Sequence, residues 1–239
     1  MPVITYITVC ISKKLIARGV YELRFKKPDG FTFKAGQFIL FDVPLVDHPA
    51  DFQTRALSIA SSPDEKDLLF VIKILPGGRL GRWIEEAVIE GTRATFKGAF
   101  GNFVLKEGTE TNLFFIATGA GIAPFRPMIQ SASLSDPDRR IDILFGVRSE
   151  EDLFWIEWLE AMSKKHANVF YHITLTLPSP SWTGHRGRVQ AVAPQIVGKD
   201  FTGKTLYVCG NPDMTTDVKT LALGEWGVDK KNLHVEGYI

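Results

Sequence analysis

Residues 114–127 read FFIATGAGIAPFRP, an apolar run that passes through small residues to a proline. The apolar start is typical of a buried β-strand, and Pro124 suits the first turn of a helix, where its missing N–H group leaves no hydrogen bond unmade. A strand that turns through glycines into a helix presents backbone N–H groups and a partial positive charge, which is the environment that a pyrophosphate needs. Taken alone, the turn Gly119-Ala120-Gly121 fits equally well a tight connection that binds nothing.

Apolar, strand-like runs alternate with amphipathic, helix-length runs through the second half of the chain, from residue 106 to residue 239. This half opens on the polar stretch KEGTETN at 106–112, which suits a connector. The expected strands are Leu113–Ala117, Ile141–Gly146, Val169–Leu175, Thr205–Cys209 and Leu233–Val235. The expected helices are Pro124–Ser133, Asp152–Lys164, Val189–Ile196 and Met214–Glu225. Such alternation predicts an α/β domain with a doubly wound parallel sheet.

The first half, residues 1–105, contains short strand-like runs separated by turn residues, and only Leu80–Ile89 has a helical pattern. Proline and glycine mark the turns at 27–30, 62–64 and 76–78. The expected strands are Val3–Ser12, Val20–Phe25, Gln37–Val43, Ala56–Ala60, Leu68–Leu75 and Ala94–Lys97. This pattern predicts a small antiparallel β-barrel.

The overall charge is close to zero. The chain has 239 residues, with 28 Lys and Arg against 27 Asp and Glu, so the formal net charge is 28 − 27 = +1. A near-neutral chain is a poor candidate for wrapping nucleic acid. No stretch approaches the ~18 apolar residues of a membrane span, and the polar residues in the opening MPVITYITVCISKKL do not suit a signal peptide. We therefore expect a cytoplasmic protein without membrane insertion.

Metal chemistry has few candidate ligands in this sequence. The two cysteines, Cys10 and Cys209, are too few to hold an iron–sulfur cluster, and the five histidines form no HExxH pair. We expect no metal site. Redox chemistry in this chain would depend on an organic cofactor.

Three further segments carry groups that suit phosphates. Arg55-Ala56-Leu57-Ser58 opens an expected strand after the loop Asp51–Thr54, and an arginine held by a strand can bind a phosphate, although core structure is the simpler interpretation of this segment alone. Pro76-Gly77-Gly78-Arg79-Leu80 is a second glycine turn into a helix. Arg148 follows the second expected strand of the α/β half, where it suits a nucleotide 2′-phosphate and equally a solvated loop.

Four motifs follow one another along the chain: RALS at 55–58, the glycine turn at 76–80, TGAGIAP at 118–124 and VCGNPDM at 208–214. The chain then ends on EGYI at 236–239. In this order, and over nearly the whole chain, the motifs resemble those of the ferredoxin–NADP(+) reductase family, most of all its short bacterial ferredoxin/flavodoxin–NAD(P) reductases. The resemblance implies an antiparallel β-barrel FAD-binding domain at 1–105 and an α/β NAD(P)-binding domain at 106–239.

The resemblance also implies roles for flavin-side residues. Arg55 would hold the FAD pyrophosphate, and Ser58 would lie near flavin N5. Val71, Ile72 and Lys73 would line the ribityl and adenine side, while Gly78, Arg79 and Leu80 would offer backbone N–H groups to the diphosphate. Ala56 and Leu57 complete the flavin-side positions. Leu57 departs from the family by replacing a stacking tyrosine, and Gly81 by replacing a serine.

On the nicotinamide side, Thr118 and Gly119 would face the nicotinamide and its pyrophosphate, and Cys209 would sit against the nicotinamide at the hydride-transfer site. Glu236 and Tyr238 would complete the flavin pocket, so the implied catalytic set is Ser58, Cys209, Glu236 and Tyr238. The same motifs add four cofactor-binding positions, Gly121, Pro124, Gly210 and Met214. Ile239 replaces a terminal aromatic residue of the nearest family members.

The choice between NADP(H) and NADH depends on arginines. Arg148 and Arg188 match two family positions for the 2′-phosphate. The stretch LTLP at 175–178 lacks the third arginine, for which Arg186 is the candidate substitute. The pattern favours NADP(H) and leaves NADH open.

The resemblance implies an FAD-dependent oxidoreductase that transfers hydride between NAD(P)H and FAD. Single electrons would pass between FAD and a separate ferredoxin or flavodoxin, and we expect a monomer. Two alternatives remain: an NAD(P)H:flavin reductase that releases its flavin, and a reductase subunit of a larger electron-transfer complex. A binding module without redox chemistry fits less well, because Cys209, Glu236 and Tyr238 all match the reactive end of the pocket.

Overall fold

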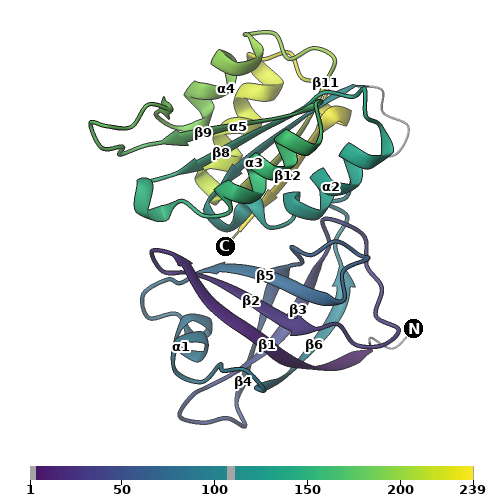
Figure 1. The fold of residues 1–239 in the computed structure, drawn as a ribbon, viewed down its shortest axis with the longest axis vertical. Helices are drawn as coiled ribbons and strands as arrows, with labels where there is room; N and C mark the ends of the chain where they lie inside the picture. Colours follow the sequence, from purple (N-terminus) through teal and green to yellow (C-terminus); the bar gives the residue numbers. More distant parts are fainter. Residues whose placement is uncertain (1–3, 107–110, 239) are drawn as a thin grey trace. The chain divides into compact units, whose positions relative to one another are not determined.

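The computed structural model describes residues 4–106 and 111–238. The chain divides into two compact units, which Figure 1 shows with their strands and helices labelled. The first unit contains Met1–Leu105 together with Ala123–Met128, and the second contains Lys106–Ile122 and Ile129–Ile239. No helix in the described residues is long and apolar enough to cross a membrane.

The first unit is built on a six-stranded antiparallel sheet in the order β4-β3-β6-β1-β2-β5. Its elements are β1 (Thr5–Ala17), β2 (Val20–Lys26), β3 (Phe38–Pro44), β4 (Phe52–Ser58), β5 (Asp67–Lys73), α1 (Arg79–Glu86) and β6 (Arg93–Phe100). Directly after β4, the Ala60 N–H donates to the Leu69 carbonyl of β5 at 2.8 Å, which links the two outermost strands. The predicted antiparallel barrel is confirmed.

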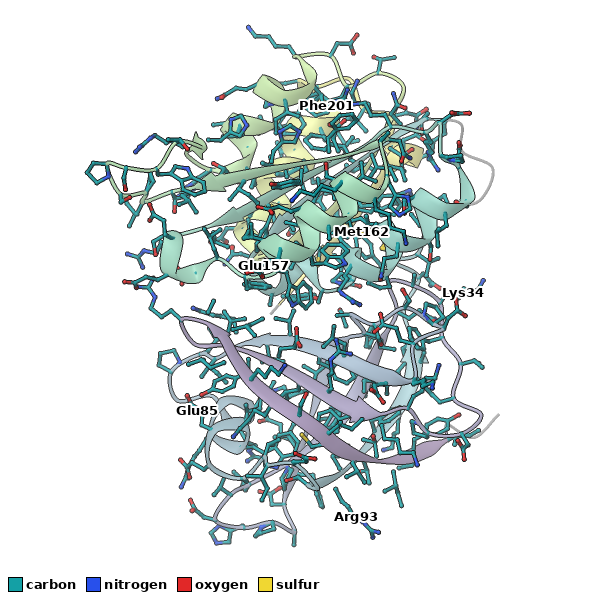
Figure 2. The ribbon with its side chains drawn as sticks, viewed as in Figure 1. Lys34, Glu85, Arg93, Glu157, Met162 and Phe201 are labelled. Carbon is teal, nitrogen blue, oxygen red and sulfur yellow. The ribbon has the colours of Figure 1, made fainter. Side chains whose placement is uncertain are left out.

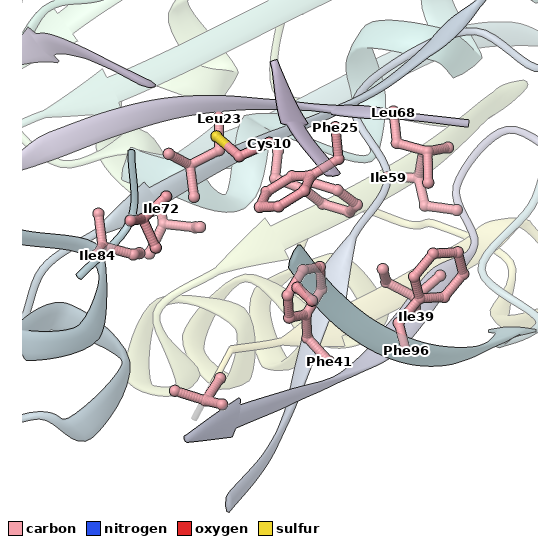
Figure 3. Packing of buried hydrophobic residues seen from close by; sticks show 14 of the residues in the cluster. Cys10, Leu23, Phe25, Ile39, Phe41, Ile59, Leu68, Ile72, Ile84 and Phe96 are labelled. Carbon is pink, nitrogen blue, oxygen red and sulfur yellow. The ribbon is translucent and has the colours of Figure 1, made fainter. Parts of the chain in front are cut away.

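The barrel core is formed by alternate residues of the strands. Phe25, Phe41 and Phe96 are each at most 1% exposed and lie among the aliphatic side chains in Figure 3. The Phe25 and Phe41 ring centroids are 5.2 Å apart. Since a fully buried phenylalanine side chain contributes about 1.5–3 kcal/mol, these rings account for much of the stability of this unit.

The fourth strand differs from the expected Ala56–Ala60. β4 begins at Phe52 and ends at Ser58, so the expected loop Asp51–Thr54 is mostly strand and Ile59 lies beyond it. The reason is that β4 is an edge strand whose first half is exposed, with Phe52 57% exposed. An edge strand without an apolar face gives little periodic signal in the sequence.

The second unit is a six-stranded parallel sheet in the order β10-β9-β8-β7-β11-β12. Its strands are β7 (Asn112–Thr118), β8 (Ile141–Val147), β9 (Val169–Leu175), β10 (His185–Arg186), β11 (Lys204–Gly210) and β12 (Leu233–Gly237). Its helices are α2 (Phe125–Ser135), α3 (Ile156–Lys165), α4 (Val189–Val197) and α5 (Pro212–Gly224), with 3-10 turns at Gly119–Ile122 (η1), Glu150–Asp152 (η2) and Lys230–Asn232 (η3). The predicted parallel α/β sheet is confirmed, and the strand order reverses direction beside β7.

Helices cover both faces of this sheet (Figure 1). α4 and α5 pack on one face, where Phe114, Leu144 and Val218 share a core. Phe201, labelled in Figure 2, stacks on Trp226 in the same core with ring centroids 4.5 Å apart. On α3, Met162 is buried and Glu157 is exposed.

The expected helix Asp152–Lys164 is split. η2 ends at Asp152, and α3 starts only at Ile156 because Trp155 has a left-handed backbone with φ 57°. The Asp152 carboxylate accepts hydrogen bonds from the Ser149 N–H and hydroxyl at 3.2 and 2.9 Å and so closes its own short turn. A local cap therefore interrupts an otherwise helical pattern.

Candidate functional site

The register of β4 decides which way its motif residues point. Arg55 lies opposite Phe41 on β3, and Leu57 lies opposite Ile39, so these two share one face of the strand. Ala56 and Ser58 lie on the other face, where Ala56 is exposed and Ser58 is 9% exposed. Leu57 is half-buried and packs against the barrel core, which gives its side chain a packing role in the strand.

Arg55 keeps its charge available. Its Nη1 donates to the Thr54 carbonyl at 3.0 Å, and no carboxylate of the described residues lies within ion-pairing distance of it. The side chain is half-buried. A guanidinium that is partly desolvated and not neutralised suits a phosphate oxygen, because charge-assisted hydrogen bonds are stronger than neutral ones.

The glycine turn before α1 is open on one side. Gly77 has φ +73°, and nothing lies within 4 Å of where its Cβ would be. The Gly78 N–H already donates to the Leu75 carbonyl at 3.1 Å, which leaves Arg79 and Leu80 as the first-turn N–H groups of α1. The Gly78 N–H, expected to face a diphosphate, makes a hydrogen bond within the turn, and the Arg79 and Leu80 N–H groups lie at the start of α1.

Two other positions near this turn have packing explanations. A Cβ on Gly81 would come within 2.7 Å of Ile74 Cγ2, which explains why a glycine stands where the family has a serine. The Ile72 side chain belongs to the barrel core, so only its backbone can line a ligand. Val71 is buried beside it, and the exposed Lys73 donates to the Arg18 carbonyl.

In the second unit, the residues that follow β7 and the end of β11 lie very close together. A Cβ on Gly121 would come within 2.3 Å of the Cys209 carbonyl oxygen, and one on Gly210 within 2.2 Å of Thr118 Oγ1. The Asn211 N–H also donates to Thr118 Oγ1 at 3.3 Å. Gly121 and Gly210 are thus required by the close approach of two backbones, whatever they contribute to ligand binding.

Gly119 differs from these two glycines. It has φ +51°, and no atom lies within 4 Å of where its Cβ would be. The open side of the turn is therefore at Gly119, next to the half-buried Thr118. Pro124 is buried immediately before α2 and ends the turn. This turn follows β7, at the switch point of the sheet, which is where ligands bind in folds of this class.

The parallel pairing of β11 with β12 brings Cys209 opposite Glu236. Cys209 is completely buried, and its pKa is raised well above the usual value, first by burial and then by the Glu236 carboxylate. The neighbouring Tyr238 side chain and the Gly210 backbone oppose this rise in pKa without cancelling it. The Tyr238 N–H donates to the Gly210 carbonyl at 2.8 Å. Cys209 is therefore a neutral thiol at neutral pH, next to Glu236 and Tyr238.

Met214 packs under the end of β11, where its Cε would lie 3.0 Å from a Cβ on Gly210. Its side chain is 7% exposed and belongs to the core beneath α4 and α5. The polar contribution of the motif comes from Asn211, whose Oδ1 accepts from the Asp213 and Met214 N–H groups at 2.9 and 3.4 Å and caps α5. Asn211 was not singled out from the sequence, although an asparagine before Pro212 is a recognisable N-cap signal.

Three arginines lie at or just after the carboxyl ends of β8 and β10. Arg148 and Arg188 are exposed and have no carboxylate partner among the described residues. Arg186 instead donates to the carbonyls of Pro180 and Trp182 and organises the loop before β10. That loop is also held at Ser179, whose hydroxyl and N–H donate to Glu150 Oε1 at 2.6 and 2.9 Å.

The donor set of each unit fits a dinucleotide. The first unit offers the unneutralised Arg55 and the first-turn N–H groups of α1 beside the open Gly77. The second unit offers the open Gly119 at the switch point and two exposed arginines, Arg148 and Arg188, without a carboxylate partner among the described residues. Both are the arrangements that phosphates require.

Two protein families match successive parts of the chain. The Oxidoreductase FAD-binding domain family matches residues 8–105, and the Oxidoreductase NAD-binding domain family matches residues 115–220. A protein of Sorangium cellulosum, "Ferredoxin--NADP reductase B", is 34% identical over 227 residues, covering 92% of this chain and 91% of that protein.

The chain belongs to the ferredoxin–NADP reductase family. It is a flavoprotein oxidoreductase of two cofactors, FAD and a nicotinamide dinucleotide. Another relative is the reductase component of a phenol 2-monooxygenase from a Pseudomonas species, 28% identical over 195 residues. That match takes in 80% of this chain and 54% of the longer relative.

A family member of known structure has the same fold. The ferredoxin NADP+ reductase from Neisseria gonorrhoeae, solved with bound FAD and NADP, superimposes with a TM-score of 0.84 at 20% identity, covering 98% of each chain. The fold of this chain is therefore that of the family over its whole described length.

Sequence reasoning gave no role to Arg126 or Glu65. The structure joins them by an ion pair of 2.7 Å. The signal that could have drawn attention to Arg126 is its charge, alone among the apolar and small residues of 119–129. Nothing in the sequence indicates that its partner lies 61 positions earlier.

Proposed function

We propose that this flavoprotein transfers electrons between NADP(H) and a separate ferredoxin or flavodoxin through bound FAD. In this proposal residues 1–105 form the FAD-binding domain and residues 106–239 the NAD(P)-binding domain. The observation that carries the proposal is the group formed by Cys209, Glu236 and Tyr238 at the ends of β11 and β12. That group lies beside the glycine turn at the switch point of the sheet.

Bound FAD supplies both two-electron and one-electron transfer, so it can connect a nicotinamide to a one-electron carrier. The residues of this chain bind and orient the two cofactors. Arg55 would neutralise one FAD phosphate, and the Arg79 and Leu80 N–H groups would bind the diphosphate at the start of α1. Ser58 would lie at the reactive edge of the flavin.

Cys209 would contribute an uncharged surface to the nicotinamide. Its burial and the neighbouring Glu236 raise its pKa and hold it as a thiol, so no thiolate competes for the electrophilic ring. Glu236 would hold the nicotinamide carboxamide by hydrogen bonds, and Tyr238 would cover the reactive group from the end of β12. These residues would position the reactants, and positioning alone can lower the barrier of such a reaction by several kcal/mol.

Two exposed arginines support NADP(H) as the nucleotide. Arg148 follows β8 and Arg188 is the N-cap of α4, and both keep their charge free of carboxylates in the described residues. A guanidinium suits a 2′-phosphate better than two neutral hydroxyls. Arg186 contributes less, because it is engaged with loop carbonyls.

The partner in this proposal is a soluble one-electron carrier, and the chain acts as a monomer. The name of the Sorangium cellulosum relative supports a ferredoxin, since that protein is called a ferredoxin–NADP reductase. Anaerobic reactions with purified ferredoxin and flavodoxin, each followed by reduction of cytochrome c, would identify the carrier. Equal rates with and without either carrier would contradict this part of the proposal.

The first experiment is an absorbance spectrum of the purified protein, followed by anaerobic titration with NADPH and then NADH. We expect flavin bands that bleach with NADPH at lower concentration than with NADH. A colourless protein that oxidises NADPH only after free flavin is added would indicate a flavin reductase instead. Flavin bands that neither nucleotide bleaches would contradict the proposal.

A further inference from the structure

The first turn of α2 belongs to the barrel unit, although its neighbours in sequence do not. Ala123–Met128 groups with the barrel, whereas η1 immediately before it and the residues from Ile129 onward belong to the second unit. The chain therefore leaves the nucleotide-side turn and enters the barrel unit at the next residue. The contacts that hold Ala123–Met128 in the barrel unit therefore also fix the position of the end of the turn Gly119–Ile122.

Arg126 makes the polar contacts of this segment. Its side chain is 13% exposed, and Nη1 donates to the Ala60 carbonyl at 2.8 Å and to Glu65 Oε1 at 2.7 Å. Glu65 Oε1 also accepts from the Ser62 N–H at 3.0 Å. Burial raises the pKa of Glu65, but the hydrogen bonds from Ser62 and Arg126 outweigh burial and leave the pKa lowered. The pair is therefore ionised at neutral pH.

The carbonyl that Arg126 holds is two residues after Ser58. The backbone of this segment is already fixed on its other sides, because the Ile59 N–H donates to the Gln37 carbonyl at 3.0 Å and the Ala60 N–H to the Leu69 carbonyl at 2.8 Å. Arg126 Nη1 donates to the Ala60 carbonyl of this segment. The Arg126 guanidinium thus binds directly to the segment that follows Ser58, the residue assigned to the flavin edge.

Apolar contacts hold the same helical turn on both sides of Arg126. Phe125 is fully buried, and its ring centroid is 5.9 Å from that of Phe103. Gly36 has φ +97°, and a Cβ there would come within 3.0 Å of Met128 Sδ. These contacts explain why the turn packs on the barrel, but they do not require a buried charge. An arginine side chain that is only 13% exposed is costly to desolvate, and the Glu65 carboxylate and Ala60 carbonyl that it contacts offset that cost.

We propose that Arg126 is a positioning residue for flavin reduction. By holding Ala60 and Glu65, it fixes the segment that follows Ser58 relative to the segment that follows Gly119–Ile122. Arg126 lies five residues beyond Gly121, and it binds the carbonyl two residues beyond Ser58, so within the barrel unit one side chain holds the segments that follow both motifs. The proposal rests on the roles given above to Ser58 and to the glycine turn.

The test compares Arg126→Gln and Arg126→Lys with the wild type. FAD-loaded protein is mixed anaerobically with NADPH, and the limiting rate of flavin reduction and the apparent Kd for NADPH are measured by stopped flow. We expect the limiting rate of Arg126→Gln to fall at least about tenfold, because small misplacements of reacting atoms have effects of that size. The apparent Kd changes less than the rate. Arg126→Lys restores part of the rate, since an ammonium can donate to Glu65 and Ala60 as Nη1 does, but from a shorter side chain without the planar guanidinium.

A second readout separates positioning from stability. With NADPH deuterated at the transferred position, the primary isotope effect on flavin reduction is expected to increase in Arg126→Gln, because the chemical step becomes more fully rate-limiting. Arg24→Gln is the matched control: Arg24 Nη1 lies 3.6 Å from Glu65 Oε2, so this change also removes a cation from Glu65 but leaves Ala60 held. Its reduction rate should stay near that of the wild type.

Glu65→Gln provides the same test if Arg126→Gln does not fold, and a smaller loss of rate is expected because the amide still accepts a hydrogen bond. Limiting rates and isotope effects equal to the wild type in FAD-loaded Arg126→Gln would overturn the proposal, whatever happens to the melting temperature. An equal loss of rate in Arg24→Gln would overturn it as well. A wild type that no nicotinamide nucleotide reduces would instead refute the proposed function, and the role of Arg126 with it.

Discussion

The two glycine-rich turns of this chain look alike in sequence and differ in structure. In the turn before α1, Gly77 has open space where its Cβ would be. In the turn after β7, Gly119 is equally open, but Gly121 is pressed against the Cys209 carbonyl. A glycine at a phosphate-binding turn can therefore serve a ligand or serve the contact between two strands. Only the distances to neighbouring atoms tell the two uses apart.

Among the substitutions that test this comparison, Gly121→Ala should have the largest effect, a loss of stability. Its Cβ would lie 2.3 Å from the backbone oxygen of Cys209, and backbone cannot move aside as a flexible side chain can. We expect the free energy of unfolding of the second unit to fall by about 3 kcal/mol, the upper end for overpacking. Denaturant unfolding followed by tryptophan fluorescence measures this.

The FAD spectrum is the control for Gly121→Ala. Below its unfolding transition the variant should keep its flavin bands, because the substitution lies outside the barrel strands. A variant as stable as the wild type would mean that the approach of η1 to β11 is looser than 2.3 Å implies. The comparison between the two turns would then fail.

Arg55→Ala tests the other side of the comparison, where a side chain rather than a backbone contact is expected to bind the ligand. Arg55 has no carboxylate partner among the described residues, so its removal leaves no buried charge behind. We expect FAD binding to weaken by about 1.5–3 kcal/mol, the value of a charge-assisted hydrogen bond. Equilibrium dialysis of FAD, with unfolding measured in parallel, checks this. A variant that purifies with a full complement of FAD would show that the phosphate clamp lies elsewhere.

The sequence predicts the elements well where apolar runs are continuous, as in β7, β8 and β9, because each lies inside the parallel sheet with a neighbour on either side. It fails at the start of β4, an exposed edge, and at the start of α3, where the left-handed Trp155 interrupts the pattern. In the candidate site, the sequence shows where the glycines are, but it does not show which of them are required by a close contact and which leave an open space. The contacts of Gly121 with Cys209 and of Arg126 with Glu65 join residues far apart in the chain, which local patterns cannot show.

The two cysteines give a matched pair, one in each unit. Cys209 is fully buried beside Glu236, and Cys10 is 1% exposed in the barrel core. Cys209→Ser should lower the limiting rate of flavin reduction about tenfold, equivalent to ~1.4 kcal/mol in the barrier, while FAD stays bound. Cys10→Ser should leave the rate unchanged and lower only the melting temperature. Stopped-flow reduction by NADPH measures both, and equal rates in the two variants would remove Cys209 from the reaction.

The smallest effects are expected at the two open glycines, and they give the sharpest form of the comparison. Gly77→Ala and Gly119→Ala each place an alanine at a positive φ, +73° and +51°, with nothing within 4 Å of the new Cβ. Each should lower the free energy of unfolding by about 1–2 kcal/mol, the cost of a left-handed backbone for a residue with a Cβ. Because both variants have the same backbone cost, a difference between them in cofactor binding shows which cofactor each turn binds. Gly77→Ala should weaken FAD retention and leave the NADPH titration of the remaining holoprotein unchanged, whereas Gly119→Ala should raise the NADPH concentration needed to bleach the flavin. If both variants lose FAD to the same degree, the two open turns do not serve separate cofactors.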